Sequence, residues 1–327
     1  MASQTVYSVV VPCYNEQDCI LETHRRLSLV MRGMGEPYEI VYVNDGSRDK
    51  TPEMLDELAA GDPAVRVVHF ARNAGHQAAV SAGLRYASGQ AVVIIDADLQ
   101  DPPEVIPEMA RMWKEGAQVV YGKRRAREGE TAFKKWTAKA YYRLLRYLAG
   151  NAIPEDTGDF RLAAREVVDV VNAMPEHARF LRGMFAWAGF EQKPLVYDRD
   201  KRFAGETHYP LRKMLRLASH GVLSFSEKPL LWPLWLGLLW LAAGGVLLLV
   251  LLVSLIAGRG TLGLGTPVLL CLGFGSVLAS LGVLGAYLAR VYDEVKGRPL
   301  YVVSRTLGFD GDAPGAPPLP PSTRRRA

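Results

Sequence analysis

Short apolar runs alternate with longer amphipathic stretches through the first 125 residues. The runs are rich in β-branched residues, and several are apolar on both faces, as the buried strands of a parallel sheet are. We expect strands at Tyr7–Val11, Tyr38–Val43, Val65–Phe70, Ala91–Ile95 and Gln118–Tyr121. Strands and helices in alternation predict an α/β fold with an open, doubly wound sheet.

One of the intervening helices has a clear start. Thr51 followed by Pro52 and Glu53 is typical of a helix N-terminus, with Thr51 as the cap. Apolar positions then recur at helical spacing and predict the face that packs on the sheet: Met54, Leu55, Leu58 and Ala59.

The pattern changes sharply in the second half of the chain. Between residues 229 and 289 the one charged side chain is Arg259. The uncharged runs Leu230–Ala257 and Thr266–Ala289 are each long enough to cross a hydrocarbon core of about 30 Å. Residues 258–265 between them form a short, glycine-rich connection. We predict a two-helix membrane hairpin rather than a buried core hairpin, because the runs are long and lack polar alternation.

Such a hairpin leaves both of its flanks on the same side of the membrane. Basic residues crowd these flanks, at Arg212, Lys213, Arg216, Lys228, Arg290, Lys296 and Arg298. The positive-inside rule assigns that side to the cytoplasm. The N-terminus has no signal-peptide pattern, so we expect the large N-terminal body to be cytoplasmic.

The expected layout has five parts. These are a cytoplasmic domain at 1–209, a juxtamembrane amphipathic segment at 210–229, membrane helices at 230–257 and 266–290, and a cytoplasmic tail at 291–327, disordered from about 310. Phe133–Tyr147 and Leu211–Phe225 mix apolar and basic side chains, as interfacial helices do. Ordinary core-facing helices with solvated charges are the alternative for both.

Cysteine content and net charge exclude other classes. Cys13, Cys19 and Cys271 are scattered, so they predict neither a disulfide framework nor a zinc site. The net charge of +5 comes without a nucleic-acid-binding signature, so we expect no nucleic-acid partner. An anionic membrane surface is the simpler partner for this basic chain.

Polar residues follow three of the predicted strands. They lie at Pro12–Glu16, Asn44–Ser47 and Asp96–Pro103. Open parallel sheets bind ligands beyond the carboxyl ends of their strands, so these segments are the candidate site. The first turn has no G-x-G-x-x-G pattern, which argues against a dinucleotide-binding domain. A phosphate-bearing ligand would then be held by a metal and basic side chains.

Asp96 and Asp98 are the candidate metal ligands. They lie two residues apart directly after a predicted buried strand, and the amide oxygen of Gln100 is a candidate third ligand. Mg²⁺ and Mn²⁺ prefer oxygen ligands and are commonly held by one or two carboxylates plus substrate phosphates. An isolated D-x-D also occurs in ordinary turns, but its position after a strand favours a metal-bridged diphosphate.

The ordered set of motifs resembles the inverting family 2 glycosyltransferases of GT-A fold. The motifs are Val11–Glu16, Val43–Ser47, Arg72–Gln77, Asp96–Pro103 and Thr157–Leu162. Within that family the chain is most similar to the polyisoprenyl-phosphate glycosyltransferases, which include bactoprenol glucosyltransferases, dolichol-phosphate mannose synthases and aminoarabinose transferases. The resemblance continues through Arg179–Gly183 and Arg202–Tyr209 into the apolar runs, up to about Val303.

The resemblance implies a role for each matched residue. The nucleoside pocket would be lined by Pro12, Tyr14, Glu16, Asp45 and Gly46. Asp96, Asp98 and Gln100 would hold Mg²⁺ or Mn²⁺. Asp159 and Arg161 would lie where the donor sugar meets the acceptor, and Arg124, Arg161 and Arg202 would contact phosphates. His76 is a donor-side candidate, and His208 stands where relatives often have Lys.

Simpler interpretations exist for several of these residues. Pro12 and Tyr14 could merely end a strand. Asp159 could be a turn carboxylate with Arg161 as its surface ion pair. His76 could be an ordinary loop histidine.

The resemblance implies transfer of glucose from UDP-glucose to undecaprenyl phosphate or a similar polyprenyl phosphate, at the cytoplasmic face of a bacterial inner membrane. A lipid monophosphate has a second pKa near 6, so we expect Asp159 to orient a substrate rather than remove a proton. GDP-mannose and a UDP-aminoarabinose-type sugar are alternative donors, and an inactive membrane scaffold is the alternative function. A processive polysaccharide synthase is disfavoured, because the chain has Arg179–Gly183 in place of a Gln-x-x-Arg-Trp element. A homo-oligomer stays open, since some relatives form tetramers.

Overall fold

The computed structural model describes residues 5–125, 157–198 and 265–309, with a few isolated positions between 240 and 256. The chain divides into two units. The first, here called the sheet unit, comprises Met1–Tyr142, Asn151–Pro210 and Pro299–Ala327. The second comprises Arg143–Gly150 and Leu211–Arg298. Each unit is described by itself.

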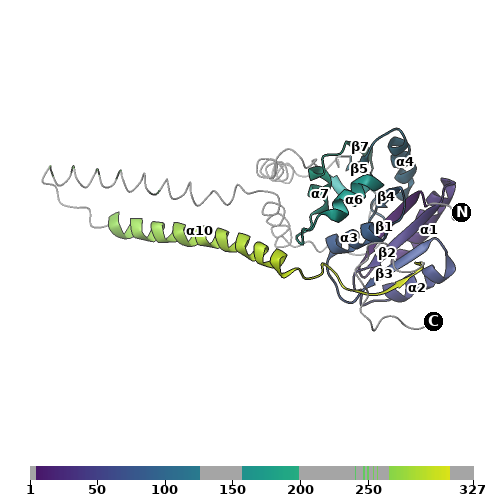
Figure 1. Ribbon diagram of the computed structural model, residues 1–327, viewed down its shortest axis with the longest axis horizontal. Helices are drawn as coiled ribbons and strands as arrows, with labels where there is room; N and C mark the ends of the chain where they lie inside the picture. Colours follow the sequence, from purple (N-terminus) through teal and green to yellow (C-terminus); the bar gives the residue numbers. More distant parts are fainter. Residues whose placement is uncertain are drawn as a thin grey trace. The chain divides into compact units, whose positions relative to one another are not determined.

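A mixed sheet forms the centre of the sheet unit. Its strand order is β7-β5-β6-β4-β1-β2-β3-β8 (Figure 1). The strands are β1 Tyr7–Cys13, β2 Tyr38–Asn44, β3 Val65–Phe70, β4 Ala91–Ile94, β5 Val119–Arg124, β6 Thr157–Ala164, β7 Gln192–Tyr197 and β8 Val303–Leu307. Strands β1 to β4 are parallel to one another, whereas β6 and β8 run antiparallel to their neighbours. The predicted α/β class is confirmed.

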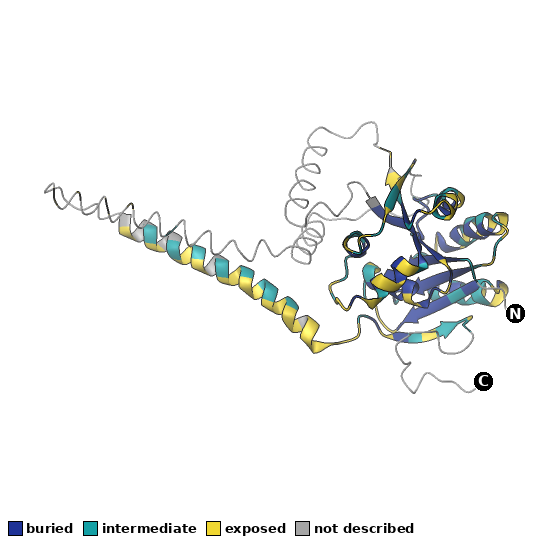
Figure 2. Cartoon of the chain, turned by 45° about the horizontal axis from the view of Figure 1, so that its top comes forward, coloured by how far each residue is buried: buried dark blue, intermediate teal, exposed yellow. Residues whose placement is uncertain are grey.

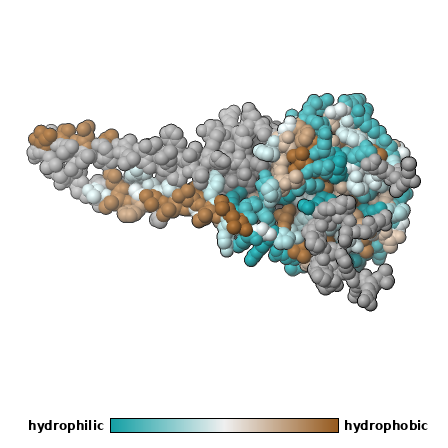
Figure 3. Space-filling view, viewed as in Figure 1, coloured by the Kyte–Doolittle hydropathy of each residue, from teal (hydrophilic) through white to brown (hydrophobic). Residues whose placement is uncertain are grey.

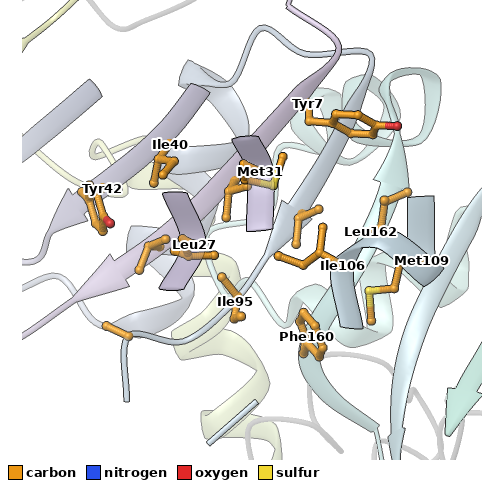
Figure 4. Close-up of a cluster of buried hydrophobic side chains, with 14 of the residues drawn as sticks. Tyr7, Leu27, Met31, Ile40, Tyr42, Ile95, Ile106, Met109, Phe160 and Leu162 are labelled. Atoms are coloured by element: carbon orange, nitrogen blue, oxygen red, sulfur yellow. The ribbon is translucent and has the colours of Figure 1, made fainter. Parts of the chain in front are cut away.

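Helices cover both faces of this sheet. They are α1 Ile20–Gly33, α2 Thr51–Gly61, α3 His76–Tyr86, the 3-10 turn η1 Pro103–Val105, α4 Ile106–Lys114, α6 Arg165–Ala173 and α7 Leu181–Trp187. Tyr7 of β1 belongs to a buried cluster with Leu27 of α1 and Ile106 of α4 (Figure 4). Val10 of β1 faces the other way, toward Gly83 of α3, where a Cβ would lie 2.1 Å from Val10 Cγ1. The sheet is therefore doubly wound, as predicted.

Every residue of β1 is buried, which accounts for its largely apolar character (Figure 2). The hydroxyl of Ser8 within it donates to Glu39 Oε1 of β2 at 2.6 Å. A strand covered on both faces has no position where a polar side chain reaches water. Burying a valine or leucine side chain contributes about 1.5–3 kcal/mol each, so these central strands supply much of the stability that fixes the site.

Several predicted boundaries need adjustment. Strands β1 and β2 run one or two residues further than predicted, β4 ends at Ile94, and β5 extends from Val119 to Arg124. Thr51 is the first residue of α2 rather than its cap, and its hydroxyl accepts a hydrogen bond from the Glu16 N–H at 2.9 Å. The predicted inward face of α2 is confirmed, since Leu55 is buried and its three apolar companions pack against the core.

In the second unit, the described element is α10, Gly265–Lys296. Within the described residues one helical segment, Gly273–Lys296, is long and apolar enough to cross a membrane, with a mean hydropathy of 1.5. Hydrophobic side chains run along α10 and many are exposed, among them Phe274, Leu281 and Leu288 (Figure 3). The helix matches the second predicted apolar run and continues past the predicted end at residue 290.

Other predicted segments lie outside the described residues. These are the first apolar run Leu230–Ala257 apart from its few isolated described positions, the two amphipathic segments Phe133–Tyr147 and Leu211–Phe225, and the chain from 310 onward. The region assigned to a tail has structure in its first part, because α10 extends to Lys296 and residues 303–307 form β8 at the edge of the sheet.

Candidate active site

The predicted site segments converge at one edge of the sheet. Strands β4, β1 and β2 are adjacent and parallel, so their carboxyl ends lie together. Strand β6 runs the other way beside β4, so its first residues lie at that same edge. Tyr14, Asp45, Asp96 and Asp159 therefore meet there although they come from four different strands or strand ends.

The register of β4 and β6 brings two carboxylates together. Ile94 pairs with Arg161 at the end of β4. Because the two strands are antiparallel, Asp96, two residues after Ile94, lies next to Asp159, two residues before Arg161. His76, the first residue of α3, contacts both. Its Nε2 lies 3.1 Å from Asp159 Oδ2 and 3.8 Å from Asp96 Oδ1. This interaction joins three segments that are far apart in sequence.

Asp159 is buried and held by cationic side chains. Arg182 of α7 donates from Nε to Asp159 Oδ1 at 2.7 Å, and Gln77 Nε2 donates to Oδ2 at 3.3 Å. Burial by itself would raise the pKa of Asp159, but the hydrogen bond with His76 and the charge of Arg182 hold that pKa well below its usual range. The carboxylate is therefore a weak proton acceptor at neutral pH.

His76 carries the complementary shift. Burial by itself would lower the pKa of His76, but the hydrogen bond with Asp159 and the charges of Asp96 and Asp159 raise it to about 9. The imidazole is thus protonated at neutral pH. It is a positive charge between two carboxylates, and it begins α3 rather than lying in a loop. Its role on the donor side stays a prediction.

Arg161 lies beneath this cluster and is buried. Its guanidinium donates to the backbone carbonyls of Asp159 at 3.3 Å and Gly158 at 3.1 Å, and stands 4.7 Å from the ring centroid of Phe185. Burial lowers its pKa to about 10. Asp159 lies in a strand and its carboxylate pairs with Arg182, so the alternative of a turn carboxylate with Arg161 as a surface ion pair is wrong.

The segment after β4 is rich in negative charge. Asp98 Oδ1 accepts the Gln100 backbone N–H at 3.1 Å, and the Tyr197 hydroxyl donates to Asp101. Burial raises the pKa of Asp96 to about 6, and the charges of Asp159, Asp98 and Asp101 add to this rise against the opposing effect of His76.

This donor set fits a divalent cation that is completed by a ligand. Among the described residues, no three carboxylate, imidazole or thiol groups already converge as metal ligands. Mg²⁺ is usually held by one or two carboxylates plus substrate phosphates, and a cation here would offset the negative charge that raises the pKa of Asp96. The assignment of Asp96, Asp98 and Gln100 as ligands stays a prediction.

Backbone N–H groups hold the carboxylate of Asp45. Its carboxylate accepts N–H groups of Ala74 at 2.6 Å and Gly75 at 3.0 Å. Burial raises its pKa, and these two backbone hydrogen bonds oppose the rise. Gly46 follows at φ +65°, and a Cβ there would lie 2.6 Å from the Arg72 carbonyl carbon. The loops after β2 and β3 are therefore locked together at this end of the site.

The loop after β1 joins the same arrangement. Asn15 has φ +56°, its N–H donates to Ser47 Oγ at 3.0 Å, and its side-chain oxygen accepts the Arg48 N–H at 2.9 Å. Tyr14 is 44% exposed, so its ring is accessible for stacking on a nucleobase, whereas Pro12 is buried within β1. The predicted nucleoside-binding roles of these residues, of Glu16 and of Asp45 stay predictions.

Sequence reasoning left out two residues of the cluster and named others that cannot be placed. Arg182 and Gln77 were not among the predicted site residues, because their position depends on how α7 packs beside α3. Both nevertheless fall within motifs of the resemblance, Gln77 within Arg72–Gln77 and Arg182 within Arg179–Gly183. Arg124 ends β5, but its side chain lies outside the described part, as do Arg202 and His208 entirely.

Comparison with known proteins places this geometry in context. Residues 8–171 match the family model described as "Glycosyl transferase family 2". The "Uncharacterized glycosyltransferase YkcC" of Bacillus subtilis is 47% identical, over 95% of this chain and 97% of its own. The "Bactoprenol glucosyl transferase" of Shigella phage SfII is 38% identical, over 91% of this chain and 97% of its own.

Among solved structures, glucosyl-3-phosphoglycerate synthase from Mycobacterium tuberculosis is similar to this chain. That structure holds Mn²⁺, UDP and glucosyl-3-phosphoglycerate. The similarity covers 67% of this chain and 78% of that one, with 21% identity and a TM-score of 0.47.

Proposed function

Because this chain belongs to glycosyltransferase family 2 and is a glycosyltransferase of GT-A fold, we propose that it transfers glucose from UDP-glucose to a polyprenyl phosphate, such as undecaprenyl phosphate. The observation that carries the proposal is the cluster at the sheet edge. Asp159 is held ionised between His76 and Arg182, beside Asp96, with Arg161 beneath. The cluster places cationic side chains beside carboxylates, and transfer between two phosphate-bearing substrates requires such cations to offset the negative charge.

A lipid acceptor is supported by two observations. Relatives that align along nearly their whole length carry the name bactoprenol glucosyl transferase. In addition, α10 has the length and composition of a membrane helix. A lipid phosphate lies at the membrane surface, so an enzyme anchored there meets its acceptor without a search through solution.

The acceptor's own chemistry explains why a low pKa suits Asp159. A phosphate monoester has a second pKa near 6, so it is largely a dianion at neutral pH and is already nucleophilic. The enzyme then has to bring two anions together in line rather than remove a proton. Arg161 and Arg182 offset the charge of the acceptor, and Asp159 orients both Arg182 and the sugar.

The metal proposal concerns the donor end of this cluster. Asp96, Asp98 and Gln100 would hold Mg²⁺ or Mn²⁺ against the diphosphate of the nucleotide sugar. A bound divalent cation stabilises the negative charge that develops on the leaving nucleoside diphosphate. Tyr14 would pack against the base, with Pro12, Glu16, Asp45 and Gly46 shaping the pocket around it.

The proposed membrane arrangement extends beyond the described residues. We propose that Leu230–Ala257 and α10 form a two-helix hairpin, that the catalytic domain faces the cytoplasm, and that the protein resides in a bacterial inner membrane. Arg124 at the end of β5 and Arg202 in the segment before the membrane would contact phosphates. Assembly of several copies stays open.

A panel of labelled nucleotide sugars tests the proposed function. The purified full chain is mixed with undecaprenyl phosphate and Mg²⁺ or Mn²⁺, and label is counted in the lipid phase. We expect transfer from UDP-glucose above all other donors. Preference for GDP-mannose or a UDP-aminoarabinose-type sugar would change the donor assignment. Label released as free sugar would indicate a hydrolase, and no turnover with any donor would favour an inactive scaffold.

A further inference from the structure

We infer that β8 positions the nucleoside end of the donor site through a chain of side chains formed by Arg305, Asp56, His69 and Asn44. This inference rests on the proposed function, because it takes the loops after β1 and β2 as the nucleoside pocket. None of these four residues touches the ligand in that account. They are positioning residues.

The chain begins at the edge of the sheet. Arg305 of β8 lies opposite His69 of β3 in the antiparallel ladder. Its Nη2 lies 2.7 Å from Asp56 Oδ2 on α2, and the other oxygen of Asp56 lies 3.0 Å from His69 Nε2. One carboxylate therefore joins the edge strand to a histidine that is 3% exposed.

The chain continues from His69 to the ligand edge. Asn44 pairs with His69 in the ladder of β2 and β3, and its Nδ2 lies 2.9 Å from His69 Nδ1. The side-chain oxygen of Asn44 accepts the Ser47 N–H at 3.0 Å. Ser47 in turn accepts the Asn15 N–H through its hydroxyl. The path thus ends in the two loops that carry Tyr14 and Asp45.

The direction of each hydrogen bond is fixed by its neighbours. Because the Asn44 oxygen is used by the Ser47 N–H, its NH₂ group faces His69 and donates to Nδ1. Nδ1 must then be unprotonated, so Nε2 carries the hydrogen and donates to Asp56. Burial and the nearby charge of Arg305 lower the pKa of His69, which favours this neutral tautomer. The neutral His69 is held in place by Asp56 and in turn fixes the side chain of Asn44, and it adds no positive charge next to the pocket.

A second set of contacts supports the loop after β3. The Ala71 N–H donates to the Val302 carbonyl at 2.9 Å. The ring of Tyr301 stacks on Phe70 with centroids 4.8 Å apart and planes at 5°. Residues 71–75 then lead to the two N–H groups that bind the Asp45 carboxylate. Residues 301–305 thereby contact the loop after β3 directly, and they reach the loops after β1 and β2 through His69 and Asn44.

An ordinary structural role would be to cover the edge of the sheet. That role requires the backbone ladder of β8 alone, and any polar side chain at position 305 would serve it. Arg305 is 47% exposed and Asp56 is 32% exposed, and such a pair contributes little to stability. If β8 only covers the edge, loss of the Arg305 guanidinium should leave the donor KM unchanged. If Arg305 is a positioning residue, the donor KM should rise.

The experiment measures donor and acceptor kinetics of the full chain in detergent or lipid nanodiscs. Arg305→Ala is compared with Arg305→Lys, which retains a cation for Asp56, and with Thr306→Ala, the adjacent position on β8. We expect Arg305→Ala to raise the KM for UDP-glucose by roughly threefold to tenfold, as the loss of one hydrogen bond to a charged group would. The kcat, the acceptor KM and the thermal unfolding midpoint should stay near those of Thr306→Ala, and Arg305→Lys should recover most of the loss.

A second variant tests whether the residues act as one chain. Asp56→Ala removes the shared carboxylate, with Glu57→Ala as its exposed neighbour on α2. We expect a donor KM at least as high as in Arg305→Ala, and the double variant to be no worse than Asp56→Ala alone, because coupled residues are not additive. Additive effects, an unchanged donor KM, or equal falls in all kinetic parameters would overturn the inference.

The two proposals fail in distinguishable ways. If the parent protein transfers sugar and Arg305→Ala equals Thr306→Ala, the positioning role is wrong and the function stands. If the parent transfers no sugar from any nucleotide donor, the proposed function fails and this inference fails with it.

Discussion

The two ends of the site hold their carboxylates in opposite ways. At the proposed nucleoside end, Asp45 is bound by peptide N–H groups, and burial raises its pKa. At the proposed transfer end, Asp159 is bound by Arg182 and His76, which lower its pKa. The first end is held by a glycine and hydrogen-bonded loops. The second is held by charged side chains, which is the arrangement that the proposed reaction between two anionic substrates would need.

The largest effect is expected from removing the metal or one of its proposed ligands. Chelation should abolish transfer, and Mg²⁺ or Mn²⁺ should restore it, because the proposed cation would stabilise the charge that develops on the leaving diphosphate. Asp98→Ala should lose metal-dependent transfer, whereas Asp169→Ala, an exposed carboxylate on α6, should retain it. Initial rates of label transfer across metal concentrations provide the measurement. Full activity in the presence of chelator would show that transfer does not require a divalent metal.

Asp159→Asn should lower kcat by about a hundredfold or more, which is the range seen when a preorganised electrostatic group is lost. The amide keeps the shape of the side chain but leaves Arg182 and His76 without their anion. Single-turnover transfer, compared with Asp169→Asn, gives the measurement. Turnover close to that of the parent would show that Asp159 does not take part in the reaction.

Gly46→Ala tests the end held by a glycine and hydrogen-bonded loops. The new Cβ would meet backbone atoms at 2.6 Å, at a positive φ that disfavours any side chain. We expect the free energy of unfolding to fall by roughly 1–3 kcal/mol and the donor KM to rise, with the acceptor KM unchanged. Gly61→Ala, where a Cβ meets nothing within 4 Å, is the matched control. Equal behaviour of the two variants would contradict a tightly packed loop junction.

The smallest effect is a contrast in pH dependence. The pKa of His69 is lowered, so its contribution to stability is present above about 6.5 and is lost as the pH falls below that value. The pKa of His76 is raised to about 9, so its contribution is present below about 6.5 and is lost as the pH rises through 9.

Thermal unfolding midpoints across this pH range, without metal or nucleotide, measure the contrast. His69→Gln should flatten the acidic side of the profile, and His76→Gln should flatten the alkaline side. If both variants changed the same side, the two histidines would not be in the opposite charge states assigned to them.

The parallel half of the sheet was accessible from sequence because its strands are buried on both faces. Each of β1 to β4 was predicted to within two residues at its ends, since short runs dominated by β-branched and other apolar residues fit few other structures. Strands β6, β7 and β8 were not predicted. In β6 the polar residues Asp159 and Arg161 interrupt the apolar pattern, and in β8 Ser304, Arg305 and Thr306 conceal it. The polar side chains to which we assign roles in β6 and β8 are therefore among those that break the apolar pattern of these strands.

The candidate site was likewise predictable only in part. Asp96 and Asp98 were identified as candidates from their place directly after a buried strand. The partners of Asp159 do not, because His76, Gln77 and Arg182 reach it from helices whose packing no local pattern encodes. The link from Arg305 to Asn44 was equally hidden, since it depends on the register of β8 beside β3.

In the proposed reaction the acceptor is already an anion and needs orientation rather than deprotonation. The most direct measurement supplies labelled UDP-glucose to the full chain with undecaprenyl phosphate or with undecaprenol, which lacks the phosphate, and counts label in the lipid phase. We expect label in the phosphate reaction and none above background in the alcohol reaction. Equal transfer to undecaprenol would require a base that activates a hydroxyl, and would contradict the role given to Asp159.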